Sequence, residues 1–317
     1  MVRLACLVAL LAGFASTAAI ADPAARPQDI GLLDSARESL FGDVYAQPST
    51  WERLTLADFF SKGWTRPWAS PPNGEGGAPR QGWLNAYDGV FYRLGILTGS
   101  YGNDFHNNGA SYTGGLTLYT PLNARFELRT DVPFVASNRD LSDPDHHDRE
   151  THFGDLQITP RFLLHEDRNV TQTLNVTLRA PTGSEDNGND FASVVPTYEL
   201  WANLWRGLVL RGGAGLTLPY SNREDSGARD ALIGNLALGY YFTPHDWAPV
   251  GDFVTYLSAN VTRPWDDRGT KDPTLTLTPG FRTHLGANWY LLGGVEVPMT
   301  HEKAFDYQVL GGLMKVF

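Results

Sequence analysis

The sequence predicts an all-β fold, a closed antiparallel transmembrane β-barrel of about twelve strands that follows a partly helical N-terminal extension. Three observations predict it. Segments of roughly ten residues alternate apolar and polar side chains, their connections alternate between short and long, and the chain begins with a secretory leader. Because a bilayer offers no water to unpaired backbone groups, an alternating chain crosses it only when its strands close on one another.

Residues 1–21 have the pattern of a signal peptide. An apolar run, Leu4–Phe14, follows a basic residue, and small residues before Asp22 provide a cleavage site. The run is too short to cross a membrane as a helix. The one cysteine of the chain, Cys6, lies within this leader, so we expect the exported protein to contain no thiol and no disulfide.

Residues 22–87 depart from the strand period and are expected to pack beneath the barrel on the periplasmic side or to plug its lumen. A capping box at Ser49–Glu52 predicts a short helix from Leu54 to Gly63. The proline-rich stretch Pro67–Gly74 then interrupts regular structure. Four tryptophans lie in this segment: Trp51, Trp64, Trp68 and Trp83. So much aromatic surface favours a packed segment over a free tail.

Residues 88–317 carry the strand period and are expected to form the barrel. The expected strands lie near residues 88–98, 110–120, 125–135, 154–164, 170–180, 196–205, 208–218, 230–242, 252–262, 274–283, 289–297 and 305–317. In the fifth strand, Leu174 and Val176 alternate with Thr173 and Asn175. Successive strand side chains point to opposite faces, so we expect the apolar set to meet lipid and the polar set to face the lumen.

The lengths of the connections favour a membrane barrel over a soluble sandwich, which shares the alternation. Connections after even-numbered strands are mostly brief, such as Arg206–Gly207, whereas those after odd-numbered strands are mostly longer and richer in charge, such as Pro181–Val195. Outer-membrane barrels have short periplasmic turns and longer external loops, so both ends of the barrel chain are expected in the periplasm. A sandwich has no reason to sort its connections in this way.

The C-terminal strand and the aromatic residues agree with this interpretation. The last strand ends on Phe317, as in the C-terminal signal of bacterial outer-membrane proteins, and Lys315 departs from its apolar face but can snorkel near the interface. Rings near strand ends are expected at the level of the lipid headgroups, with core packing as the alternative. These rings are Tyr119, Trp201, Trp205, Tyr240, Tyr241, Trp247, Trp289 and Tyr290.

Motifs for catalysis are missing from the sequence, which contains neither G-x-S-x-G nor H-E-x-x-H. The His/Asp cluster Asp143–Asp148 with His152 is interpreted as a solvated external loop, and Asp186–Asp190 lacks the distal Glu of a calcium loop. We therefore expect no enzyme activity, no metal site and no cofactor. The formal net charge of −10 argues against a nucleic-acid partner. The expected partners are outer-membrane lipids, lipopolysaccharide and a small-molecule solute, and the sequence leaves the oligomeric state open.

Charged side chains on the polar set of the strands are expected to face the lumen. These pore-lining candidates are Arg93, Glu127, Arg129, Asp131, Arg161, Arg179, Glu199, Arg211, Arg282 and Glu296. An arginine on the lipid face near midplane costs ~2–4 kcal/mol, whereas charges in a wet lumen are tolerated and set selectivity. Two alternatives stay open: the arginines line a path that favours anions, or they fill the interior as cross-strand ion pairs.

Two stretches of the sequence resemble a known family. Gly154–Phe162 and Thr173–Ser184, with a Gly-Asp-Leu strand start and a later Pro-Thr-Gly, are similar to the outer-membrane family named for the meta-pathway of phenol degradation. The resemblance implies a multi-pass barrel in the outer membrane of a Gram-negative bacterium and a channel for small compounds, aromatic ones among them. The residues add anionic compounds to this expectation. A sealed structural or adhesive barrel and a lipid-modifying barrel enzyme are the alternatives.

Overall fold

The computed structural model describes residues 29–45, 50–103, 110–138, 149–183, 191–224, 228–266 and 272–317. The expected signal peptide and Ser49 of the expected capping box lie outside these residues, as do Asp143–Asp148 and Asp186–Asp190.

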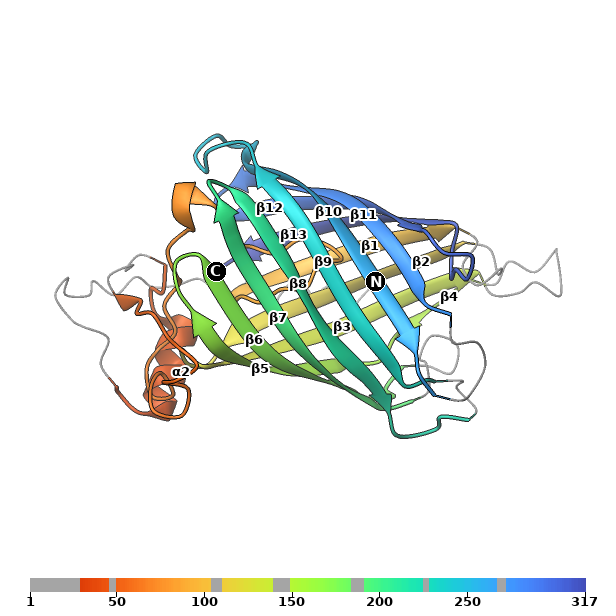
Figure 1. Cartoon of the computed structure of the whole chain (residues 1–317), viewed down its shortest axis with the longest axis horizontal. Helices are drawn as coiled ribbons and strands as arrows, with labels where there is room; N and C mark the ends of the chain where they lie inside the picture. Colours follow the sequence, from red (N-terminus) through yellow and green to blue (C-terminus); the bar gives the residue numbers. More distant parts are fainter. Residues whose placement is uncertain are drawn as a thin grey trace, which may run out of the picture.

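The described residues form a closed antiparallel barrel with twelve strand positions (Figure 1). Its strands are β1 (Leu94–Asn103), β2 (Ser111–Pro121), β3 (Phe126–Asn138), β4 (Arg149–Phe153), β5 (Gln157–Glu166), β6 (Val170–Arg179), β7 (Ser193–Trp205), β8 (Leu208–Pro219), β9 (Ala231–Tyr241), β10 (Gly251–Pro264), β11 (Thr274–Gly286), β12 (Trp289–Pro298) and β13 (Tyr307–Val316). Pairing of β1 with β13, from Leu94 opposite Val316 to Asn103 opposite Tyr307, closes the barrel. β4 and β5 share one position because both pair with β3. The predicted fold class is confirmed.

The side-chain alternation of the strands follows the prediction. On β6, Leu174 is exposed at the outer surface, whereas Thr173 and Asn175 are buried in the interior. The outer surface is the one that lipid covers, and the buried polar set must find its partners inside the barrel.

The first strand begins later than the sequence predicts. β1 starts at Leu94, and residues 88–93 turn into the barrel instead of extending the strand. The reason is that their polar groups bond to the wall: Glu127 accepts a hydrogen bond from the Tyr92 amide, and Arg211 pairs with Asp88. These contacts replace the hydrogen bonds of a strand ladder.

The extension contains two helices in its described part, α2 (Leu32–Phe41) and η2 (Glu75–Gly77). The helix expected from Leu54 to Gly63 is wrong: residues 55–62 form successive turns, held by hydrogen bonds such as Lys62 N to Asp58 O at 2.9 Å. None of the helices in the described residues has the length and apolar character needed to cross a membrane.

The extension lies at the end of the barrel where the connections are short. Figure 1 shows α2 and the C-terminus at this end, and β4 at the other. Leu54 forms an isolated antiparallel bridge with Glu166 at the end of β5, and Ala124 of the β2–β3 turn donates a backbone hydrogen bond to Arg66. We call this the short-turn end; outer-membrane barrels turn it toward the periplasm.

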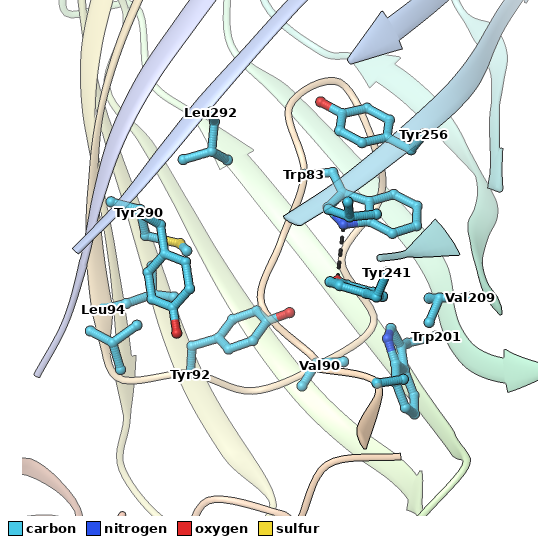
Figure 2. Packing of buried hydrophobic residues seen from close by; sticks show 14 of the residues in the cluster. Trp83, Val90, Tyr92, Leu94, Trp201, Val209, Tyr241, Tyr256, Tyr290 and Leu292 are labelled. Atoms are coloured by element: carbon cyan, nitrogen blue, oxygen red, sulfur yellow. Dashed lines mark hydrogen bonds between the residues drawn. The ribbon is translucent and has the colours of Figure 1, made fainter. Parts of the chain in front are cut away.

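A hydrophobic cluster fills the barrel at the short-turn end (Figure 2). It joins residues that precede β1 to the inner faces of β1, β2, β7 to β10, β12 and β13: Ala78, Trp83, Val90, Tyr92, Leu94, Tyr119, Trp201, Val209, Ala237, Tyr241, Val254, Tyr256, Tyr290, Leu292, Met314 and Val316. Four rings expected at the lipid headgroups therefore lie inside instead, namely Tyr119, Trp201, Tyr241 and Tyr290. Trp205, Tyr240, Trp247 and Trp289 are exposed, as expected of interfacial rings.

Candidate functional site

Residues 78–93 of the chain enter the barrel interior, and we call them the lumen segment. Their backbone bonds to strands on different sides of the wall. The Tyr87 amide donates to Asn235 Oδ1 of β9 at 2.9 Å, and the Asp88 amide donates to Glu199 Oε2 of β7 at 3.0 Å. The candidate site is therefore the lumen as this segment shapes it.

Asp88 is the main electrostatic contact between the lumen segment and the wall. Its carboxylate accepts from Arg211 Nη1 at 2.5 Å and from the Tyr92 hydroxyl at 2.6 Å. Arg161 donates to the Asp88 carbonyl oxygen and also pairs with Glu127, and all three of these residues are buried. Burial and the adjacent Asp88 carboxylate raise the pKa of Tyr92 well above its usual value, so this phenol stays a hydrogen-bond donor.

Arg80 attaches the start of the lumen segment to the short-turn end. Its guanidinium donates to Thr171 Oγ1 at 2.5 Å and to the carbonyl oxygens of Asp167 and Arg168 at 2.6 and 2.9 Å. It also lies over the Trp201 ring at 4.4 Å from the centroid. Burial lowers the pKa of Arg80, whereas nearby acidic groups, chiefly Glu166, act to raise it. A buried arginine with this many acceptors acts as a fixed attachment.

Trp83 occupies the centre of the hydrophobic cluster. Its ring stacks on Tyr256 with centroids 4.8 Å apart and planes 6° apart, and its indole Nε1 donates to the Tyr241 hydroxyl at 3.2 Å (Figure 2). Arg211 lies over the same ring at 4.8 Å. Gly239 makes this packing possible, because a Cβ there would come within 2.6 Å of Trp83.

Asn85 forms the tip of the lumen segment, with a left-handed φ of 52°. Its side-chain Nδ2 donates to Glu296 Oε2 of β12 at 2.6 Å, and its carbonyl oxygen accepts from Ser258 Oγ of β10 at 2.5 Å. The tip is therefore held against β9 to β12, and the opposite side of the lumen is left for a cavity.

A cavity of about 520 Å³ lies between the lumen segment and the wall formed by β1, β2, β3 and β13. Glycines and hydroxyl residues make up much of that wall: Gly99, Gly114, Gly115, Gly311, Thr98, Ser100, Thr113 and Thr117. Arg129 and Asp131 also line the cavity and pair at 2.9 Å, with the Arg129 side chain 38% exposed. Toward the short-turn end, the buried rings of Tyr92 and Tyr119 pack edge to face, with their centroids 5.6 Å apart.

Five of the six predicted pore-lining arginines are not among the residues that line this cavity, and three of these five lie toward the ends of the barrel or in the hydrophobic cluster. Arg93 precedes β1 and donates to three backbone oxygens at the end of α2. Arg179 pairs with Asp155 at 3.0 Å, at the end of β6 that leads to a long connection. Arg282 lies between two tyrosine rings of the cluster, and its Nη1 donates to Gln81 Oε1 at 3.4 Å.

The ten predicted residues thus separate by their partners. Arg129 and Asp131 border the cavity; Glu127, Arg161, Glu199, Arg211, Arg282 and Glu296 contact the lumen segment; Arg93 and Arg179 serve the two ends of the barrel. Sequence reasoning missed Arg80, Asn85 and Asp88, since no period marks residues of an irregular segment. Only the concentration of tryptophans, Trp83 among them, indicated that this segment is packed.

The closed barrel with a polar interior and an apolar outer surface defines the class: an outer-membrane β-barrel. The family described as "Putative MetA-pathway of phenol degradation" matches residues 88–300, and the chain belongs to this family. The resemblance noted in the sequence is therefore confirmed.

Solved structures that resemble the chain include an outer membrane channel and two porins. The COG4313 outer membrane channel from Pseudomonas putida F1 superposes with a TM-score of 0.55 at 15% identity, over 75% of this chain and 99% of that one. The NanC porin gives 0.49 at 10% identity, over 70% and 98%, and the KdgM porin gives 0.46 at 11%, over 70% and 99%. Identities this low show the fold alone. No functionally curated protein matches the chain.

Proposed function

We propose that this protein is an outer-membrane channel for small solutes, with a path that leads through the cavity beside the lumen segment. The observation that carries the proposal is the cavity itself, about 520 Å³ of space inside the barrel beside the lumen segment. Family membership and the fold shared with an outer membrane channel support it.

In this proposal residues 1–21 are a signal peptide that directs export. The N-terminal extension that follows acts as a plug. The lumen segment and the hydrophobic cluster close the short-turn end, so passage requires this segment to move. Its polar contacts converge on Asp88, where one carboxylate meets Arg211 and one carbonyl oxygen meets Arg161. Displacement of Asp88 therefore breaks the contacts of the lumen segment with β8 and β5 at the same time.

The preference for anionic or aromatic solutes depends on few groups. Arg129 is the arginine that lines the cavity, and Asp131 beside it balances its charge. An anion would gain from Arg129 only by competing with this pair. An aromatic ring would pack against Tyr119 and Leu310, which line the same space. We propose small polar or aromatic compounds as solutes, with anion preference set by the Arg129–Asp131 pair.

Conductance of the full chain in planar bilayers tests the channel, and Asp88→Asn tests the plug. This substitution keeps the size of the side chain and removes the charge that Arg211 meets. We expect the variant to open more often or to larger steps than the unsubstituted protein. The control is Asp306→Asn, which removes an exposed partner of Lys303 far from the lumen segment and should change nothing.

Two results would count against the proposal in different ways. If the unsubstituted protein and the Asp88→Asn variant have the same conductance, the protein is a channel but the lumen segment does not gate it. Silence of both, with each protein folded, would favour a sealed structural barrel, the function that the hydrophobic cluster at the short-turn end best supports as an alternative.

A further inference from the structure

Residues 55–64 of the extension lie at the rim of the barrel, and we call them the rim segment. Successive turns give it a compact shape, with the Phe59 amide donating to Leu56 O at 3.1 Å and the Lys62 amide to Asp58 O at 2.9 Å. The Thr55 hydroxyl donates to Asp58 Oδ2 at 2.6 Å. The rim segment therefore has a defined fold of its own beside the lumen segment.

Arg125 fixes the rim segment to the barrel. It lies in the turn between β2 and β3 and is fully buried. Its guanidinium donates to the carbonyl oxygens of Thr55 and Lys62 in the rim segment at 2.9 Å each, through Nη2 and Nε. Its Nη1 donates to Leu163 O of β5, also at 2.9 Å. One planar group thus sets the position of the rim segment relative to the wall.

A row of aromatic rings joins the rim segment to the outer surface of the barrel. Phe126 of β3 and Phe162 of β5 lie opposite each other, with ring centroids 5.3 Å apart. Both face outward, because the residues next to them, Glu127 and Arg161, face inward and are buried. Trp64 of the rim segment lies 6.5 Å from the Phe162 ring.

The row continues into the rim segment and ends in side chains that the protein leaves uncovered. Phe59 lies 5.4 Å from Trp64 and 5.0 Å from Phe60. Phe60 is 92% exposed, and Leu56, four residues earlier, is 61% exposed. Large apolar side chains that are exposed next to a lipid-covered wall indicate an apolar partner. Because the row of rings is continuous with that wall, the partner is expected to be the same lipid.

We propose that the rim segment is a membrane anchor that inserts Leu56 and Phe60 into the headgroup–acyl boundary of the periplasmic leaflet. Aromatic and leucine side chains favour this boundary, and Lys62, half exposed beside them, can reach the phosphate groups. Arg125 presents the anchor in a fixed orientation, so little ordering is needed on insertion. Through the shared backbone, the anchor holds the extension against the membrane while the barrel spans it.

Nitroxide labels on single cysteines test the anchor, because the chain has no cysteine beyond Cys6. The variants are Phe60→Cys and Leu56→Cys, with Leu174→Cys on the outer face of β6 as the lipid reference and exposed Glu75→Cys on η2 as the water reference. The full chain is reconstituted in vesicles of phosphatidylethanolamine and phosphatidylglycerol. Relaxation by oxygen and by a water-soluble nickel complex is then measured at each label, and the unsubstituted chain gives the background.

We expect the labels at positions 56 and 60 to resemble the lipid reference, with high oxygen and low nickel collision rates, at least threefold below position 75 in nickel accessibility. Nickel collision rates equal to those at position 75 would overturn the proposal. Low collision rates with both reagents would also overturn it, since they would show that another protein copy covers the surface.

Both anchor side chains are exposed, so we expect barrel folding not to depend on them, which allows a second measurement. Leu56→Ser and Phe60→Ser together should leave the heat-modifiable migration of the barrel unchanged. A nitroxide on Ser61→Cys, an exposed neighbour in the same segment, should then collide more often with the water-soluble nickel complex in vesicles, because the segment no longer enters the boundary. An unchanged nickel collision rate at this position in the double variant would contradict anchoring by Leu56 and Phe60.

Discussion

Asp88 and Arg211 form an ion pair inside the barrel, with Asp88 Oδ1 2.5 Å from Arg211 Nη1. Asp88 belongs to the irregular lumen segment, and Arg211 belongs to β8. Arg211 is fully buried and also donates to the carbonyl oxygen of Gln81 at 2.8 Å, so one guanidinium holds two points of the lumen segment. The interior charge network thus connects the extension to the wall as well as strand to strand.

Removal of the Asp88 charge should destabilise the protein. Asp88→Asn leaves Arg211 buried without its carboxylate, and the loss of one partner of a buried pair costs about 3–5 kcal/mol. Urea unfolding of the reconstituted protein measures the loss. The exposed pair of Asp306 with Lys303 serves as control, since Asp306→Asn should cost ~0–1 kcal/mol. Similar losses in both variants would show that Asp88 carries no special weight.

Packing of Trp83 predicts a difference between two strand glycines. A Cβ on Gly239 of β9 would come within 2.6 Å of the Trp83 ring, whereas the nearest atom to a Cβ on Gly99 of β1 is 3.8 Å away. We expect Gly239→Ala to destabilise the barrel by about 1–3 kcal/mol through overpacking, and Gly99→Ala to be close to neutral. Urea unfolding followed by tryptophan fluorescence compares them. Equal effects would mean that Trp83 does not require the gap at Gly239.

The two faces of β6 should respond differently to a charge. Val176 faces outward, so Val176→Arg places a guanidinium against lipid and should cost about 2–4 kcal/mol near midplane. Thr177 faces inward, where its hydroxyl lies 2.9 Å from that of Thr159, and Thr177→Arg should cost much less. Reversible folding into lipid vesicles gives both values. A larger loss for Thr177→Arg would reverse the assigned faces.

Ion selectivity should depend on Arg129 and Asp131 and not on the arginines that hold the lumen segment. Arg129→Gln leaves an unbalanced carboxylate at the cavity and should shift the reversal potential toward cations; Asp131→Asn should shift it toward anions. Single-channel recording in a salt gradient measures both shifts. Arg179→Gln is the matched control, because Arg179 pairs with Asp155 away from the cavity. Identical reversal potentials in all three variants would exclude Arg129 and Asp131 from the path.

The class of fold can be predicted from the amino-acid sequence alone, because the main evidence for it is local. Leu174 and Thr173 take opposite faces through the two-residue period of a strand, and that period is visible without any knowledge of neighbours. Sorted connection lengths likewise follow from chain order alone, and they predicted the short-turn end at which the extension is found. The inward position of Glu127, Arg161 and Arg211 was predicted on the same basis.

The partners of those inward charges depend on how distant parts of the chain meet in three dimensions. Glu127 and Arg161 are neighbours across two strands, but Asp88 reaches Arg161 and Arg211 from a segment with no period of its own. Such a segment is placed by the sum of its contacts with many strands, which no local pattern records. The same reason explains why residues 88–93 leave the strand predicted for them, and why Tyr119 and Trp201 lie in a buried cluster although their positions near strand ends suit a membrane interface equally well.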